Sequence, residues 1–315
     1  MTVKNCVVTG GAGFIGGHLV ERLLSENHKV AVVDDFSSGL KGTLAGIQSA
    51  NLTILEGSIL DSDLVDRALR GVNYVFHLAA IPSVVRSVEE PWATHNVNIT
   101  GTLQLLEKCR KISSLEKFVF TSSSAVYGDT PELPKKESMA GTILSPYALH
   151  KWTGEGYIRL YQSLYQVPGV SLRPFNIFGP RQRPDTQYAA VIPLFIRAAL
   201  AHQPLLIDGD GGQTRDFIYV TNMVDAFVLA AKSTDATTLG QAYNVGAGGR
   251  VSILTLAKTI VQMTGSKSEI RHAPARVGDI RDSYADLSRI SAELGYQPKV
   301  SFQSGLEALI AYYRK

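Results

Sequence analysis

The feature that most constrains the fold is a run of glycines between a short apolar segment and an amphipathic one. Residues 6–9 are apolar and β-branched, Gly10, Gly13 and Gly16 follow at three-residue spacing, and apolar residues then recur at helical spacing from Phe14 to Asn27. A glycine turn between a strand and a helix lets backbone N–H groups approach a pyrophosphate, and the start of the helix adds a positive potential. The chain therefore predicts a dinucleotide-binding unit at its N-terminus.

The rest of the chain continues this alternation of strands and helices. Short apolar runs separated by helical segments are typical of a parallel sheet covered on both faces, so we expect an α/β, doubly wound parallel sheet of the Rossmann type. The predicted strands are residues 6–9, 30–33, 52–55, 74–78, 117–121 and 169–173, and the predicted helices are residues 14–27, 62–70, 92–111 and 147–165.

The rhythm changes after Arg173, where glycine, proline, glutamine and aspartate become frequent. We expect residues 1–173 to form the dinucleotide-binding domain and residues 174–315 to form mainly a smaller C-terminal α/β lobe for the substrate. The segment from about 215 to 235, with a strand at 217–220 and a helix at 222–232, is expected to return to the first domain.

Composition excludes several classes of protein. The net charge is +3 without a cluster of lysine and arginine, so we expect no nucleic-acid partner, and the histidine spacing indicates no metal. The apolar runs are shorter than the roughly 20 residues that span a bilayer. Because the first residues do not form a signal peptide and Cys6 and Cys109 lie in apolar segments, we expect buried free thiols and a cytoplasmic protein without a membrane partner.

An acidic residue favours one dinucleotide over another. Asp34 ends the second predicted strand, 18 residues past Gly16. A carboxylate at this place accepts hydrogen bonds from the adenosine ribose and repels a 2′-phosphate. Since residues 35–38 bring no arginine, the sequence predicts NAD rather than NADP as the cofactor.

A tyrosine and a lysine one helical turn apart suggest proton transfer. Tyr147 and Lys151 would face the same way, and an ammonium beside a phenol lowers the pKa of the phenol. This pair would suit the removal of a proton from a sugar or alcohol hydroxyl. The hydroxyl-rich residues 121–124 end the fifth strand, where ligands bind in open α/β sheets, although such a run is equally typical of a turn or helix cap.

Several short motifs extend this pattern. Besides the glycine turn and Asp34, the chain carries His77-Leu78-Ala79-Ala80, serines ahead of Val126-Tyr127-Gly128, Tyr147-x-x-x-Lys151 and Arg173-Pro174-Phe175-Asn176. These motifs resemble the extended short-chain dehydrogenase/reductase family, and within it the nucleotide-sugar epimerases of the UDP-glucose (UDP-galactose/UDP-N-acetylglucosamine) 4-epimerase type. The similarity continues through residues 209–217 and 276–281, so it covers nearly the whole chain.

The resemblance implies roles for the matching positions. Tyr147 would be the base, Lys151 would polarise it and hold the nicotinamide ribose, and Ser123, rather than Ser122 or Ser124, would be the catalytic hydroxyl. The implied NAD contacts are Gly10, Gly13, Phe14, Ile15, Gly16, Asp34, Asp35, Ser38, Ser58, Ile59, Leu78, Ala79, Ala80, Asn98, Tyr147 and Lys151. The implied substrate contacts are Ser123, Tyr147, Asn176, Val191, Arg215, Arg276, Asp279 and Ser283. Asn176 and the two arginines, together with Asp279, would hold the nucleotide diphosphate.

The family also implies a mechanism and an assembly. Tyr147 takes the proton of the sugar 4-hydroxyl while C4 gives a hydride to resident NAD⁺, and the resulting 4-keto sugar turns before the hydride returns to its other face. The substrate would be UDP-glucose or UDP-galactose. The helices at 92–111 and 147–165 would form the interface of a homodimer.

Departures from the family pattern narrow the chemistry. Related sugar dehydratases carry Asp-Glu, and glucuronate decarboxylases carry Glu, where this chain has Ser124-Ala125. Pro82 stands where some epimerases have lysine, and Ser58 stands where an aspartate contacts adenine. Asp208 replaces an aromatic residue that stacks on uracil, so uridine as the base is inferred from the other motifs.

Other activities are compatible with the same motifs. Ser283 leaves room for an N-acetyl group where restricted members tend to have tyrosine, so UDP-GlcNAc and UDP-GalNAc are further expected substrates. The alternatives are a net keto-sugar reductase, a UDP-glucuronate decarboxylase or epimerase, and a non-catalytic NAD-binding regulator.

Overall fold

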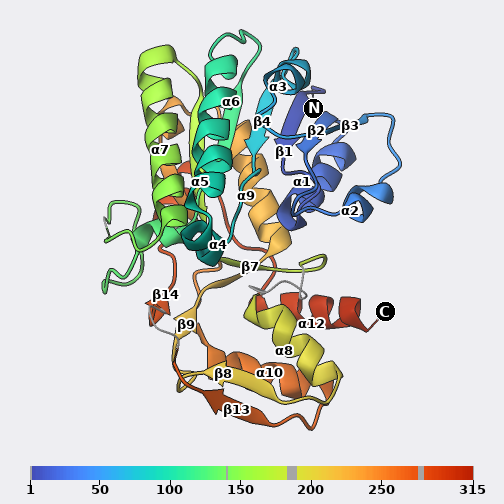
Figure 1. Cartoon of the computed structure of the whole chain (residues 1–315), viewed down its shortest axis with the longest axis vertical. Helices are drawn as coiled ribbons and strands as arrows, with labels where there is room; N and C mark the ends of the chain where they lie inside the picture. The colour runs from blue at the N-terminus through green and yellow to red at the C-terminus, as the bar shows by residue number, and fades with distance from the viewer. Residues whose placement is uncertain (1, 140, 183–189, 276–279, 315) are drawn as a thin grey trace.

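The computed structural model describes residues 2–139, 141–182, 190–275 and 280–314. A seven-stranded parallel sheet forms the upper part of the molecule in Figure 1. In spatial order its strands are β11 (Ala242–Val245), β6 (Gly169–Pro174), β5 (Lys117–Thr121), β4 (Tyr74–His77), β1 (Asn5–Thr9), β2 (Lys29–Asp34) and β3 (Leu52–Glu56). The doubly wound fold predicted from the sequence is confirmed, and the strand order reverses between β1 and β4, where such folds bind ligands.

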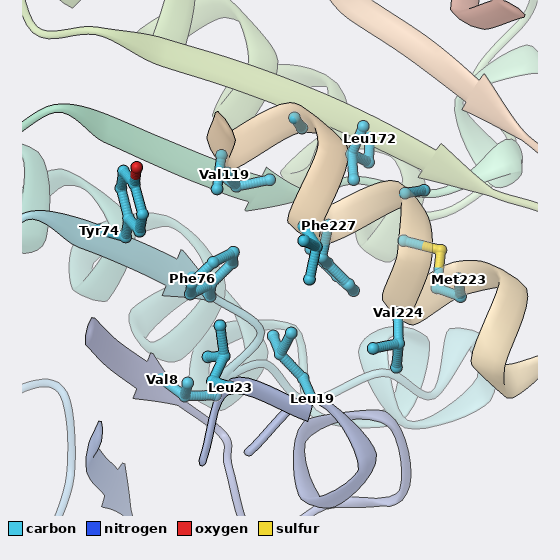
Figure 2. Close-up of a cluster of buried hydrophobic side chains, with 14 of the residues drawn as sticks. Val8, Leu19, Leu23, Tyr74, Phe76, Val119, Leu172, Met223, Val224 and Phe227 are labelled. Carbon is cyan, nitrogen blue, oxygen red and sulfur yellow. The ribbon is translucent and has the colours of Figure 1, made fainter. Parts of the chain in front are cut away.

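Helices cover both faces of the sheet (Figure 1). On one face, α1 (Phe14–Ser25) and α9 (Val220–Lys232) pack against strand residues such as Val8, Phe76 and Val119. Figure 2 shows Phe227 of α9 reaching into this cluster. On the other face lie α3 (Ser62–Ala68), α6 (Gly101–Cys109) and α7 (Pro146–Tyr165). Successive strand residues point to opposite faces, and because helices cover both faces, β1, β4, β5 and β6 are buried along nearly their whole length.

The predicted helix at 92–111 is wrong as a single element. The segment consists of α5 (Pro91–His95), a π-helical stretch η1 (Asn96–Thr100) and α6, and it is preceded by a further helix, α4 (Val84–Glu89). Within η1 the side-chain amide of Asn98 makes two hydrogen bonds with the backbone of Ile81. It accepts from the Ile81 N–H at 2.8 Å and donates to the Ile81 carbonyl at 3.1 Å. Short π-helical stretches are frequent at functional sites. Here η1 directs the side chain of Asn98 toward the loop after β4.

The remaining elements lie mostly in the lower part of Figure 1. The small sheets pair β7 (Asn176–Phe178) with β10 (Phe217–Tyr219), β8 (Leu205–Asp208) with β13 (Ile270–Ala273), and β9 (Thr214–Arg215) with both β12 (Val251–Ser252) and β14 (Asp282–Ser283). The helices are α2 (Lys41–Ala45), α8 (Val191–Leu200), α10 (Ile253–Thr264), α11 (Ser288–Leu294) and α12 (Phe302–Tyr313), with 3₁₀ turns η2 (Ser124–Tyr127) and η3 (Ala236–Thr238). A third apolar cluster joins α8, α10 and α12.

Two elements after residue 173 pack with the seven-stranded sheet, one as a covering helix and one as a strand. Helix α9 packs against α1 and β5, and β11, a strand that the sequence did not predict, pairs with β6. Strand β10, which precedes α9, pairs instead with β7. The division of the chain into residues 1–173 and 174–315 remains our proposal.

The cysteines and helices add two observations. Cys6 and Cys109 are buried free thiols. Among the residues that the structure describes, every helix is too short or too polar to cross a membrane.

Candidate active site

A cavity of about 630 Å³ opens at the carboxyl ends of β1, β4 and β5, beside the strand-order reversal. It brings together many of the predicted site residues from distant parts of the chain. Those that line it are Gly10, Gly13, Phe14, Ile15, Gly16, Ser38, Leu78, Ala79, Ala80, Ser123, Tyr147, Lys151, Asn176 and Val191.

The glycine turn forms a backbone cradle on one side of this cavity. Gly10 has a φ of 73°, and a Cβ there would lie 2.7 Å from the N atom of Ala79. A Cβ on Gly16 would lie 2.2 Å from the carbonyl oxygen of Gly10. Gly13 is the N-cap of α1 and brings no capping side chain, so the turn presents backbone and the positive end of a helix, as an anionic pyrophosphate requires.

Asp34 braces this turn from behind the cavity lining. Its carboxylate accepts hydrogen bonds from the backbone N–H groups of Ala12 and Phe36 at 2.8 and 2.9 Å. Burial raises the pKa of Asp34 above its ordinary value, and the two backbone donors act in the opposite direction. Carboxylate oxygens accept more than one hydrogen bond, so contact with a ribose hydroxyl stays a prediction beside this bracing role.

Four other predicted cofactor residues lie outside the cavity lining. Asp35 is exposed and accepts a hydrogen bond from the N–H of Ser37, and the Ser58 hydroxyl accepts one from Leu60 N–H. Ile59 is buried against Gly101 of α6. The fourth, Asn98, holds the backbone of Ile81 and thereby the loop at 78–82, which lines the cavity. The contacts of these four residues with NAD stay predictions.

His77 orders the same loop through a chain of hydrogen bonds. Its Nδ1 lies 2.8 Å from Thr9 Oγ1, its Nε2 lies 2.9 Å from Thr102 Oγ1, and Thr102 donates its own proton to the carbonyl of Asn98. Thr102 therefore accepts from His77, which puts the ring proton on Nε2 and makes Thr9 the donor to Nδ1. Burial lowers the pKa of His77 to about 3, so the ring is neutral.

The start of helix α7 explains where Tyr147 lies. Ser145 is the N-cap and accepts a hydrogen bond from Ala148 N–H at 3.2 Å, and Pro146 occupies the first helical position, where proline is favoured. The N–H of Tyr147 donates to the hydroxyl of Ser87 in α4 at 3.0 Å. Helix α7 thus begins one residue before Tyr147, and α4 fixes it there.

Tyr147, Ser123 and Lys151 meet in the cavity. The phenol of Tyr147 is hydrogen-bonded to Ser123, whose Oγ also accepts from Ala125 N–H at 3.1 Å. The ammonium of Lys151 donates to the carbonyl of Thr121 at 2.9 Å and lies 5.8 Å from the centre of the Tyr147 ring.

The expected direction of the Tyr147 pKa is corrected by the structure. Burial raises the pKa of Tyr147, and the hydrogen bond with Ser123 opposes this only in part. Burial also lowers the pKa of Lys151 to about 8. Burial thus disfavours the charged form of each group, because desolvation penalises each charge, but a pKa of about 8 leaves Lys151 mostly an ammonium at neutral pH. The sequence predicted the neighbouring ammonium but not the burial of the phenol, which raises its pKa.

The predicted substrate residues are only partly brought together. Asn176 and Val191 line the cavity, whereas Arg215 and Ser283 are half-buried neighbours on the paired strands β9 and β14, outside the lining. Arg276 and Asp279 lie outside the described residues. Asp208 ends β8, and Gln213 donates to its backbone carbonyl at 2.8 Å.

An arginine that the sequence did not indicate also lines the cavity. Arg181 follows β7, and its guanidinium donates to both carboxylate oxygens of Glu21 in α1 at 2.9 and 2.6 Å. The ring of His18 contacts the carbonyl of Pro180 at 3.0 Å. In the sequence, Arg181 could have been noticed because Gly179-Pro180-Arg181 directly follows the short strand β7. These contacts join α1 to the segment opposite it.

Metal binding finds no support in this geometry. Within the described ranges, histidine, cysteine and acidic side chains form no group of three that could hold a metal ion. The functional groups that meet at Tyr147 are hydroxyls, an ammonium and backbone.

Comparison with known proteins identifies the family. Residues 6–246 match the NAD dependent epimerase/dehydratase family. The chain belongs to this family. A UDP-glucose 4-epimerase of Mycolicibacterium smegmatis is 38% identical over 315 residues, with 98% of each chain covered. Sugar-nucleotide decarboxylases and dehydratases are also among the similar proteins.

Solved structures agree with this assignment. A UDP-N-acetylglucosamine 4-epimerase from Methanobrevibacter ruminantium M1, in complex with UDP-N-acetylmuramic acid, has a TM-score of 0.94 at 39% identity, covering 100% of this chain and 99% of its own. A UDP-glucose 4-epimerase of Thermus thermophilus, in complex with NAD, has a TM-score of 0.87 at 35% identity, covering 98% and 99%. The prediction of NAD as the cofactor is confirmed, and the backbone cradle at Gly10 and Gly16 fits it.

Proposed function

We propose that this chain interconverts the C4 epimers of a UDP-hexose, UDP-glucose and UDP-galactose, through a transient 4-keto sugar. The observation that carries the proposal is the hydrogen-bonded pair of Tyr147 and Ser123, which lies in one cavity with Lys151 and the glycine cradle. Two hydroxyls beside an ammonium can move a proton to and from a sugar hydroxyl, as reversible oxidation at C4 requires.

Tyr147 and Ser123 divide the proton transfer between them. Bound NAD supplies the acceptor for hydride. Tyr147 removes the proton of the sugar 4-hydroxyl, and Ser123 orients that hydroxyl and passes its proton. When the 4-keto sugar has turned within the cavity and its C4 takes the hydride back on the other face, Tyr147 returns the proton to the C4 oxygen. The starting protonation state is then restored.

Lys151 provides the charge that the base needs. Burial alone disfavours a phenolate at Tyr147 and an ammonium at Lys151. An ammonium close to a phenolate stabilises it, so each charge would favour the other within the shared cavity. The bond from Lys151 to the Thr121 carbonyl fixes the ammonium near the ring. The pair therefore ionises together more readily than either group alone.

The residues beside Ser123 support epimerisation over the reactions of other family members. Ser124 lines the cavity, and Ala125 donates its N–H to Ser123. Neither residue brings a carboxylic acid that could protonate a leaving hydroxyl. Dehydration and glucuronate decarboxylation are therefore less favoured alternatives, because the acid that related enzymes carry at these positions is missing. A net keto-sugar reductase and a non-catalytic regulator are separated from the epimerase by assay.

The decisive assay supplies UDP-galactose without added cofactor. We expect the purified protein to form UDP-glucose, measured by chromatography or proton NMR, because the cofactor is regenerated in each cycle. A net reductase would form no product, and a regulator would bind NAD without turnover. Failure to interconvert any C4 pair among UDP-glucose, UDP-galactose and their N-acetylated analogues would exclude the epimerase. A positive result with UDP-galactose would place the chain in galactose metabolism.

We further propose that N-acetylated UDP-hexosamines are accepted, with Ser283 as the residue that leaves room for them. Replacing Ser283 by tyrosine is expected to lower kcat/KM for UDP-GlcNAc by about tenfold or more, because a bulky ring would crowd the 2-substituent, while UDP-glucose is affected less. The measurement compares both substrates with wild type and with Ser283→Ala, which adds no bulk. An unchanged ratio of the two substrates would show that another residue sets this preference.

We also propose a cytoplasmic homodimer, with α6 and α7 in the interface. Leu160 and Leu164 lie one turn apart on α7 and are 53% and 65% exposed, and Trp92 of α5 is 75% exposed. Apolar side chains at such spacing are typical of helix-mediated association. Sedimentation velocity is expected to give a dimer for the wild type and a monomer for Leu160→Glu combined with Leu164→Glu. A monomeric wild type would contradict the proposal. The location is supported by the free thiols of Cys6 and Cys109.

A further inference from the structure

Three side chains of α7 hold three successive residues at the end of β5. Tyr147 is hydrogen-bonded to the Ser123 hydroxyl, Lys151 binds the Thr121 carbonyl, and Glu155 accepts a hydrogen bond from the Ser122 hydroxyl. These helix residues are four apart and therefore share one face. The first two contacts belong to the proposed chemistry, whereas the third joins Ser122 of the cavity lining to Glu155, which lies outside that lining.

Glu155 is fixed by a buried arginine. Arg173 of β6 donates from Nε and from one terminal nitrogen to the two carboxylate oxygens at 2.8 and 2.7 Å. The side chains of Arg173 and Glu155 are 3% and 2% exposed. Two parallel hydrogen bonds between a planar guanidinium and a carboxylate restrict both groups in position and in orientation. The acceptor offered to Ser122 is therefore held by the sheet as well as by α7.

The same arginine holds the far end of the turn that carries Ser123. The 3₁₀ turn η2 has Ser123 as its N-cap and ends at Tyr127. The other terminal nitrogen of Arg173 donates to the hydroxyl of Tyr127 at 2.9 Å, and Tyr127 donates to Asn244 of β11 at 2.5 Å. The short segment between Ser122 and Tyr127 is thus fixed at both ends by one ion pair.

The energetics of burial indicate that this ion pair contributes more to geometry than to stability. Removing two charges from water is costly, and a buried ion pair contributes little more to stability than well-packed apolar side chains would. What it provides is directional contacts. The geometry points to a positioning function, which rests on the proposed epimerase: we propose that Glu155, Arg173 and Ser122 set the place of the Ser123 hydroxyl relative to the Tyr147 phenol.

Ser122→Ala is the sharpest test, because it removes the link to Glu155 and leaves the ion pair in place. We expect kcat to fall about tenfold, since small misplacements of reacting groups cost up to about a hundredfold in rate. The KM for the UDP-hexose and the content of bound NAD are expected to stay within twofold. Ser268→Ala, which removes another buried, hydrogen-bonded hydroxyl in the C-terminal part, is the matched control and should keep wild-type kcat.

A double-mutant cycle separates positioning from a general loss of structure. If Ser122 acts through Ser123, then Ser122→Ala should change kcat by less than twofold in a Ser123→Ala background. Equal losses in both backgrounds would overturn the inference, as would a wild-type kcat for Ser122→Ala. Thermal unfolding of each variant shows whether any loss follows stability instead.

A readout that needs no turnover keeps this test distinct from that of the epimerase. The hydrogen bond with Ser123 lowers the pKa of Tyr147, so Ser122→Ala is expected to raise it. The titration is followed by ultraviolet difference spectroscopy of the holoprotein, with Tyr147→Phe subtracted to isolate this ring. An unchanged titration would overturn the positioning function even if the wild type failed to epimerise, whereas inactivity of the wild type alone would count only against the proposed function.

Discussion

Tyr147→Phe is expected to lower kcat for UDP-galactose by about 10²–10⁴-fold, the usual contribution of a positioned acid or base. Phenylalanine keeps the ring and its packing but removes the hydroxyl that bonds to Ser123. The glycine cradle and the loop at 78–82 are unaffected, so the purified variant should retain bound NAD, which acid extraction and chromatography measure.

A tyrosine-to-phenylalanine substitution further along α7 gives the control for Tyr147→Phe. Tyr157 is a half-buried residue of α7 that packs beneath the sheet and contacts the ring of Tyr161. Tyr157→Phe should keep turnover within about twofold, as expected of a change away from the reacting groups. If Tyr147→Phe also turned over at that level, the base would have to be sought elsewhere in the cavity.

Gly16→Ala is expected to yield protein without bound NAD and without activity. The added Cβ would lie 2.2 Å from the Gly10 carbonyl oxygen and 2.7 Å from the Cα of Gly11, and both contacts are with backbone. The turn must therefore open, which removes the approach of its N–H groups to a pyrophosphate. Overpacking of this kind also destabilises a fold by about 1–3 kcal/mol, so the midpoint of thermal unfolding should fall.

A second glycine substitution distinguishes the cradle from a general effect. At Gly42, in α2, a Cβ would meet open space among the described residues. Gly42→Ala should keep both NAD and turnover. Full NAD content in Gly16→Ala would mean that the turn does not hold the cofactor in the way that its geometry implies.

The parts of this molecule that could be predicted from the sequence are those that local patterns determine. The strand at residues 6–9, the glycine turn and the helix that carries Tyr147 each depend on neighbours within a few residues. The strand β11 and the break at Asn98 depend on distant partners, β6 and the backbone of Ile81. Alternation of apolar residues carries no signal for such contacts.

The same division holds for the cavity. The structure brings Tyr147 and Ser123 into one cavity, but the raised pKa of the phenol follows from burial, which only the folded chain shows. Asp34 was predicted as a contact of the ribose, and its bonds to Ala12 and Phe36 reveal a role in the turn itself. A sequence motif identifies which residues gather at a site, whereas their protonation and their partners depend on the surrounding structure.

The link between Arg181 and Glu21 bears on the kinetics of the cofactor. Residues of α1 and of the segment after β7 both line the cavity, and the two hydrogen bonds of the ion pair hold these two parts of the chain together. The pair is partly exposed, at 20% and 46% for the two side chains, so dissolved salt screens it. We therefore expect the residence time of bound NAD to shorten as ionic strength rises, which would make an ion pair at the protein surface a determinant of how long the cofactor stays bound.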